Sequence, residues 1–256
     1  IRDLNMDTAN ELQLDALRKE IRGPLASFAG ELGGKLDYNL ESITVTGSSL
    51  TEDYTEGVSD INTVVLLKDR NPESLDSIAS MAKSMKKRNL SAPLLMTDAY
   101  IQRSLDVFGI EFLDIQNNHT TIYGTDPFEG LDISKADVRI QCERELKASL
   151  IRLRQGYIAS GANKRLIKDI LIAAVKGLLP VLRAMLWLRD YERPLASAEV
   201  LTRTADMFPM NVDSLLLVRS WHYSKVKPVK DDMPGVFESV YETFDKLAAE
   251  VDAHEV

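Results

Sequence analysis

The sequence contains very little of what builds disulfide scaffolds or metal clusters. Its 256 residues include one cysteine, Cys142, and three histidines. A lone cysteine excludes an internal disulfide framework and a cysteine-rich zinc site, and it is typical of proteins in a reducing compartment. The histidines at positions 119, 222 and 254 have no metal-ligand spacing. We therefore interpret them as structural or solvated residues.

Long hydrophobic runs and an excess of positive charge are also missing. The most apolar stretch, residues 170–188, is interrupted by Lys176 and Arg183, and no apolar segment with a cleavage site opens the chain. The formal net charge of -8 argues against a nucleic-acid coat and allows a cationic or magnesium-bound partner. We therefore expect a cytoplasmic protein that has no membrane partner, and nucleic acid is not its expected ligand.

The hydrophobic content is high enough for real cores. Hydrophobic residues make up 45% of the chain, and 256 residues suit one large domain or two of ordinary size. The character of the pattern changes near residue 135, from short apolar runs to helical periodicity. This change predicts two domains, an α+β domain over residues 1–135 and an all-helical bundle domain over residues 136–256.

The first predicted domain mixes strands and helices. Its short apolar runs predict strands, which we place at residues 43–46, 61–67, 93–96 and 109–115. Helical periodicity covers about residues 8–32 and 73–88. The dipeptide Asn71-Pro72 marks an element boundary. Together these elements predict a small mixed sheet with flanking helices.

The second predicted domain shows helical periodicity only. The expected helices lie at about residues 136–160, 163–190, 196–207, 212–224 and 234–253. Pro180 falls inside the second of these helices, where it removes one hydrogen bond and should kink or split the helix.

The polar loop between the first two predicted strands carries the residues that point to a function. Gly47 has no Cβ, so backbone N–H groups at this turn can approach a phosphate closely, and the hydroxyls of Ser48 and Ser49 add donors. Asp60 and Asn62 lie two residues apart in a strand and therefore share a face. Their oxygen atoms suit Mg²⁺, which completes its shell with substrate phosphates and water.

A third acidic group is expected near this loop. Glu111 lies in the predicted strand 109–115 and can accept a proton from an attacking hydroxyl if it comes within hydrogen-bond reach. Asp114 would point to the opposite face of that strand, so only one of the two should face the site. We take Glu111 as the candidate and Asp114 as the alternative.

The loop and the strand after it resemble the signature of the nucleotidyltransferase superfamily, which includes polymerase beta and the aminoglycoside adenylyltransferases. That signature is an apolar residue, Gly, then Gly or Ser, a spacer, and Asp-apolar-Asp/Glu-apolar. Here residues 46–48 read Thr-Gly-Ser and residues 60–63 read Asp-Ile-Asn-Thr. The resemblance covers residues 38–125 by motif and the remainder by layout, and Glu111 lies where the family has a third carboxylate.

The resemblance implies transfer of a nucleoside monophosphate to a hydroxyl of an unidentified acceptor, either a small molecule or a protein. The expected donor is ATP, which would supply AMP, and another nucleoside triphosphate is the alternative. In such a reaction Gly47 and Ser48 would hold the β- and γ-phosphates, and Asp60 and Asn62 would bind Mg²⁺. Glu111 would activate the hydroxyl. The family's second metal carboxylate is Asn62 here, which removes one negative charge from the metal site. The alternative is therefore a catalytically silent nucleotide-binding module that acts through a partner.

Basic residues on the first long helix of the second domain have two possible roles. They are Arg139, Arg144, Lys147, Arg152 and Arg154. One or more of them could meet phosphates, or they could pair with Glu143 and Glu145 of the same helix or simply face water.

Overall fold

The computed structural model describes residues 12–223 and 232–254 and has the predicted α+β fold. The chain folds into two compact units. The sheet unit comprises Ile1–Leu105 and Ile115–Asp132, and the helical unit comprises Asp106–Asp114 and Ile133–Val256. A short segment from the middle of the chain thus belongs to the helical unit.

The sheet unit contains a mixed sheet of four strands in the order β3-β2-β1-β4. The strands are β1 (Leu40–Thr46), β2 (Asn62–Leu67), β3 (Leu94–Met96) and β4 (His119–Tyr123). β1 runs antiparallel to β2 and β4, while β2 runs parallel to β3. The predicted strands at 43–46, 61–67 and 93–96 are therefore confirmed, and the first two are neighbours, as expected.

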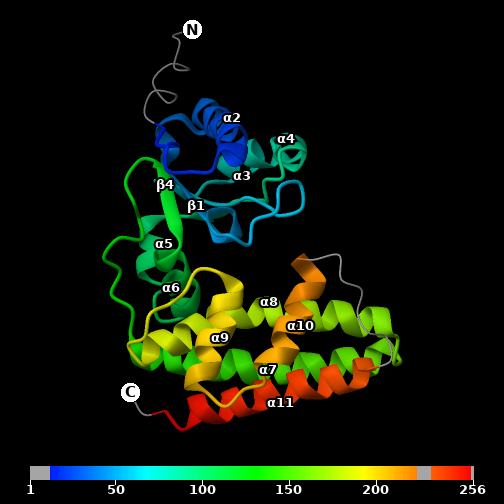
Figure 1. Cartoon of the computed structure of the whole chain (residues 1–256). Helices are drawn as coiled ribbons and strands as arrows, with labels where there is room; N and C mark the ends of the chain where they lie inside the picture. Colours follow the sequence, from blue (N-terminus) through cyan, green and yellow to red (C-terminus); the bar gives the residue numbers. More distant parts are fainter. Residues whose placement is uncertain (1–11, 224–231, 255–256) are drawn as a thin grey trace. The chain divides into compact units, whose positions relative to one another are not determined.

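Helices cover one face of this sheet (Figure 1). They are α2 (Lys19–Leu36), α3 (Pro72–Ala79) and α4 (Ala82–Lys87). The core between them and the sheet joins Phe28 of α2 to Val45 of β1 and Ile122 of β4, all fully buried. The sheet unit also contains the short helix α5 (Asp98–Gln102).

Local signals in the sequence place two of the boundaries in the sheet unit. Asn71 caps α3, since its side chain accepts a hydrogen bond from the Ser74 N–H at 2.8 Å, and Pro72 begins the helix as predicted. Gly124 ends β4 with a positive φ of 74°. A Cβ at this position would overlap the carbonyl oxygen of Glu41, so only glycine fits there.

The predicted strand at 109–115 is wrong, because this segment is the helix α6 (Gly109–Asn117). Its four buried apolar residues fall three apart in two pairs, a spacing that suits a helix: Ile110 and Leu113, Phe112 and Ile115. The strand that pairs with β1 is β4, a few residues further on. Glu111 and Asp114, also three apart, therefore lie near one face of a helix and not on opposite faces of a strand.

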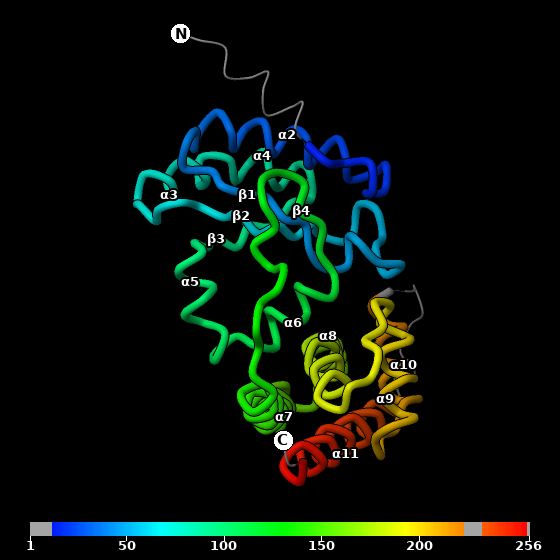
Figure 2. Tube along the Cα trace, turned by 90° about the vertical axis from the view of Figure 1, so that its left-hand side faces the viewer, coloured from blue at the N-terminus to red at the C-terminus, as the bar shows by residue number. Residues whose placement is uncertain are grey.

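The helical unit matches its predicted helices closely. They are α7 (Lys135–Ser160), α8 (Lys164–Leu188), α9 (Ser197–Met207), α10 (Val212–Tyr223) and α11 (Met233–Asp252). Figure 2 looks along the axes of α7 and α8 and shows the other helices grouped around α8. α8 packs against all four of these helices, so it is the central helix of the bundle.

α8 is long and apolar enough to cross a membrane by length and composition alone. In this structure 44% of its most apolar window is buried inside the bundle, which is consistent with the core helix of a soluble protein. Pro180 does not split it, since one helix continues from Lys164 to Leu188. The proline does remove the N–H that would bond to the carbonyl of residue 176.

Candidate functional site

The turn after β1 and the start of β2 lie at the same end of an antiparallel pair. Thr46 is in register with Asn62, which places Gly47 directly beside Asn62. Gly47 has a positive φ of 76°, and a Cβ there would lie 3.1 Å from Nδ2 of Asn62. Both the backbone conformation and the close approach of the amide therefore favour glycine at this position.

The two serines after Gly47 have different surroundings. Gly47–Leu50 forms a short 3-10 turn, whose first N–H groups have no acceptor within the turn. Ser49 is buried, and its hydroxyl donates to the carbonyl of Thr46 at 3.3 Å. Ser48 is half-buried, and its hydroxyl makes no hydrogen bond within the described part of the chain. Ser48 is therefore better placed than Ser49 to meet a phosphate.

Asp60 and Asn62 are exposed at the edge where β2 begins. Ile61 between them is buried and forms a bridge to Leu90, which fixes the backbone at this point. Since side chains alternate along a strand, Asp60 and Asn62 project to the same side. One carboxylate and one amide oxygen are donors that fit Mg²⁺, which usually takes few protein ligands and keeps water and phosphate oxygens.

Two residues that the sequence did not indicate for this site, Asn118 and His119, lie beside the turn. Asn118 donates from Nδ2 to the carbonyl of Gly47 at 2.9 Å. His119, in register with Thr46, places Nδ1 at 2.8 Å from the carbonyl of Ile115 and Nε2 at 2.7 Å from Oδ2 of Asp126. Both partners of His119 are acceptors, so they fix the orientation of the ring at the start of β4. This is consistent with the structural role expected of His119.

Glu111 belongs to the helical unit, whereas Gly47, Ser48, Ser49, Asp60 and Asn62 belong to the sheet unit. It lies in the first turn of α6 and lines a pocket with residues of α7 and α8. Desolvation raises the pKa of Glu111 above its ordinary value, and the nearby carboxylates of Glu145 and Asp114 add to this effect. Its neighbour Asp114 forms an ion pair with Arg183 at 2.8 Å.

Four of the five basic residues singled out on α7 are paired with glutamates of the same helix. Glu143 accepts from Arg139 at 3.2 Å and from Lys147 at 2.5 Å. Glu145 accepts from Arg144 at 3.3 Å and from Arg152 at 3.4 Å. Arg154 lies 6.0 Å from the centre of the Tyr241 ring. Of the two roles open to these residues, pairing within α7 is the one that the structure supports.

Comparison of the sequence with models of known protein families and with curated proteins finds no match. The resemblance to nucleotidyltransferases therefore depends on the signature at residues 46–63 and on its geometry. The residues of that signature meet at one end of β1 and β2.

Proposed function

We propose that the sheet unit binds ATP with Mg²⁺ at the Gly47 turn and transfers AMP to a hydroxyl group of an acceptor. The observation that supports this proposal is the meeting of Gly47, Asp60 and Asn62 at the adjacent ends of β1 and β2. The N–H groups and the Ser48 hydroxyl at the turn offer donors to phosphate oxygens. Asp60 and Asn62 offer oxygen ligands to the ion.

The proposed reaction is a displacement at the α-phosphorus. The acceptor oxygen forms a bond to this phosphorus, the bond to the bridging oxygen of the β-phosphate breaks, and pyrophosphate leaves. Mg²⁺ held by Asp60 and Asn62 would neutralise charge on the phosphate oxygens. The hydroxyl proton must pass to a base. Glu111 is the sequence-based candidate for this base, but its predicted strand is the helix α6 and Glu111 itself belongs to the helical unit, so we assign no residue to the proton.

A second candidate function is nucleotide binding without transfer. Two observations favour it. Asn62 stands where the family signature has its second carboxylate, and β4, the strand that pairs with β1 in place of the predicted one, contains no Asp or Glu. In that case the protein would act through a partner, with the nucleotide as a bound ligand only.

We also propose a cytoplasmic location. Cys142, the one cysteine in the sequence, is buried, and burial raises the pKa of its thiol to about 12. Such a thiol stays protonated and unreactive, which suits a protein without disulfides.

The test combines nucleotide binding with product release. ATP and Mg²⁺ should raise the melting temperature, because a ligand that binds only the folded state stabilises it, by about 2.7 kcal/mol at a hundredfold excess over Kd. Pyrophosphate release in the presence of a panel of acceptors then separates transfer from silent binding. A melting temperature that does not respond to ATP and Mg²⁺ would exclude both candidate functions.

Asp60→Ala should abolish most of the shift in melting temperature while leaving the apo protein folded, since Asp60 is exposed. The matched control is Asp69→Ala, which removes an exposed aspartate just beyond the other end of β2 and should keep the full shift. If both variants respond like the wild type, Asp60 is not a ligand of the metal.

A further inference from the structure

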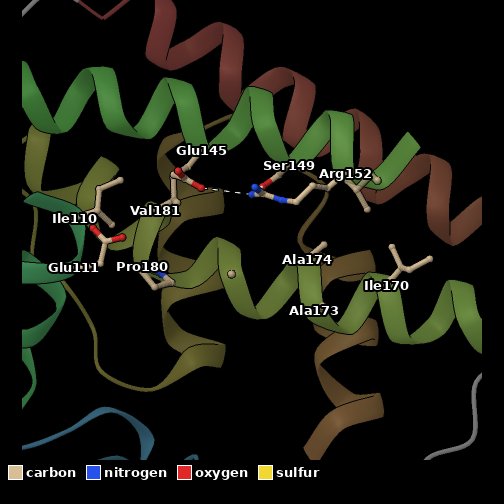
Figure 3. A pocket seen from close by; sticks show the side chains of 12 residues that line it. Ile110, Glu111, Glu145, Ser149, Arg152, Ile170, Ala173, Ala174, Pro180 and Val181 are labelled. Carbon is tan, nitrogen blue, oxygen red and sulfur yellow. Dashed lines mark hydrogen bonds and ion pairs between the residues drawn. The ribbon is translucent and has the colours of Figure 1, made fainter. Parts of the chain in front are cut away.

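The helical unit contains a cavity of about 420 Å³ between α6, α7 and α8 (Figure 3). Cavities of this size are typical of sites for small organic molecules. All the residues that line it belong to the helical unit, whereas Gly47 belongs to the sheet unit.

The lining is mostly apolar, with polar groups at one side. α8 contributes small or apolar side chains, among them Ile170, Ala173 and Val181. The polar groups come from α6 and α7, and they are Glu111, Glu145, Ser149 and Arg152. Figure 3 shows Glu111 and Glu145 at the end of the cavity near Pro180 and Val181.

The two carboxylates differ in what they bind. Glu145 accepts from Arg144 and from Arg152, and Arg152 also donates to the Ser149 hydroxyl at 2.8 Å. The charge of Glu145 is therefore compensated inside the protein. Glu111 accepts from no other side chain within the described residues, and burial and the nearby acids raise its pKa. Glu111 is an exposed carboxylate on the wall of a mostly apolar cavity, and Arg144 acts on it through its charge without a hydrogen bond. A cation in the cavity could therefore pair with it directly.

The α8 side of the cavity leaves room where a larger side chain could stand. Gly177 lines the cavity in the middle of α8, and a Cβ built on it has no atom within 4 Å. Glycine inside a helix costs about 1 kcal/mol relative to alanine. No steric conflict explains glycine at this exposed position, and the space beside it is free for a ligand.

We propose that this cavity binds a small organic cation, an apolar body that carries a single protonated amine. The ammonium group would pair with Glu111, and the apolar body would lie against the α8 wall near Gly177 and Val181. A polycationic sugar fits poorly, because its hydroxyls would lack partners along this wall. An anion would meet the carboxylate of Glu111 without a free cation to offset it.

The probe for this proposal is phenethylamine, titrated into the full-length protein and followed by calorimetry and by melting temperature. Phenethyl alcohol has the same body without the charge, and phenylacetate has the opposite charge. We expect saturable binding of phenethylamine, binding of the alcohol weaker by about tenfold or more, and no binding of phenylacetate. Equal binding of the amine and the alcohol, or no binding of the amine at all, would overturn the proposal.

Two variants locate the site. Glu111→Gln should weaken the binding of phenethylamine by about tenfold and leave the binding of phenethyl alcohol unchanged. Gly177→Leu should block the binding of both ligands by filling the cavity. The matched controls are Glu73→Gln, in the first turn of α3, and Gly30→Leu, an exposed glycine of α2 with no atom within 4 Å of its Cβ position. Wild-type amine binding in Glu111→Gln would place the amine elsewhere and refute the proposal, even if Gly177→Leu fails to fold.

Discussion

Asn62 is the residue that most separates this chain from the nucleotidyltransferase signature. Its side chain lies against Gly47 at the exposed start of β2, and Asp60, two residues before it, is also exposed. Asn62→Asp keeps the size and adds a negative charge. Without metal, repulsion from Asp60 should lower the free energy of unfolding, by less than about 1 kcal/mol because both groups are exposed. With Mg²⁺ and ATP, the added ligand should tighten binding.

Asn62→Asp should lower stability without metal and tighten binding with Mg²⁺ and ATP. A magnesium titration separates these two effects and is therefore the informative measurement. Melting temperature and pyrophosphate release should be followed together in the variant and the wild type. Tighter binding with faster release supports the transferase, and tighter binding without release supports the silent module. A variant that differs from the wild type by the same amount at every Mg²⁺ concentration would show that position 62 does not face a metal.

Glu111 should make stability depend on pH. Its pKa in the folded protein is raised above the ordinary value of 4.5. The folded state therefore holds this proton more tightly than the unfolded state, and stability falls as pH rises from 4.5 through the folded pKa. Glu111→Gln removes this loss, so its melting temperature should exceed that of the wild type at neutral pH. The difference should vanish below pH 4.5.

Melting curves across this pH range test the prediction, with Glu73→Gln as the control for losing a carboxylate near a helix N-terminus. That control should show no gain at neutral pH, since a negative charge in the first turn of a helix is favourable. A variant Glu111→Gln that melts below the wild type at neutral pH would mean that the carboxylate is stabilised and not desolvated.

Part of the candidate site could be read from the sequence, because it is local. Gly47 and Asn62 are brought together by one antiparallel pair, and their spacing already placed them at the same end of two strands. Asn118 could not be found in this way. Its bond to the Gly47 carbonyl joins residues 71 positions apart and depends on β4 pairing with β1. No local motif encodes that pairing.

Among the helices of the helical unit, two glycines have opposite surroundings. A Cβ at Gly177 of α8 would meet nothing within 4 Å, whereas a Cβ at Gly156 of α7 would meet Cδ1 of Ile170 at 3.0 Å. Gly177→Ala should raise the free energy of unfolding by about 0.5–1 kcal/mol through better helix propensity. In Gly156→Ala, overpacking of α7 against α8 should cancel that gain. Denaturant unfolding of both variants measures the contrast, and equal stabilisation would contradict it.

How well each helix or strand was predicted depends on the strength of its hydrophobic pattern. The long helices of the helical unit have many turns of periodic apolar residues, so their ends were predicted to within a few residues. The segment 109–115 is short, and its apolar residues fit an alternating strand almost as well as a helix. Thr120 and Thr121 have strand propensity but little hydrophobicity, so β4 gave no apolar signal.

The sequence pattern at 73–88 predicted one helix, and only the structure shows that there are two. The chain forms two shorter helices, α3 and α4, with Ser80 and Met81 between them. Met81, between the two helices, is buried in the core with Met85. Helical periodicity alone does not report such a break, because both pieces keep the same pattern.

In the molecule as a whole, α6 is the element that belongs to both units. Its residues up to Asp114 group with the helical unit, and its residues from Ile115 group with the sheet unit. Asp114 pairs with Arg183 of α8, and the carbonyl of Ile115 bonds to His119 of β4. Unfolding of either unit would therefore remove the support of part of this helix. We predict that the two units unfold in one cooperative transition.

Insertion of two glycines after Asp114 should uncouple the units, because it interrupts α6 where the two groups of interactions meet. Calorimetry should show one transition for the wild type and two for the insertion variant. The control is the same insertion after Gly130, an exposed position in the connection between β4 and α7, and it should keep one transition. If the wild type already melts in two steps, α6 does not couple the units. In the uncoupled variant, ATP with Mg²⁺ should shift only the transition of the sheet unit, and phenethylamine only that of the helical unit.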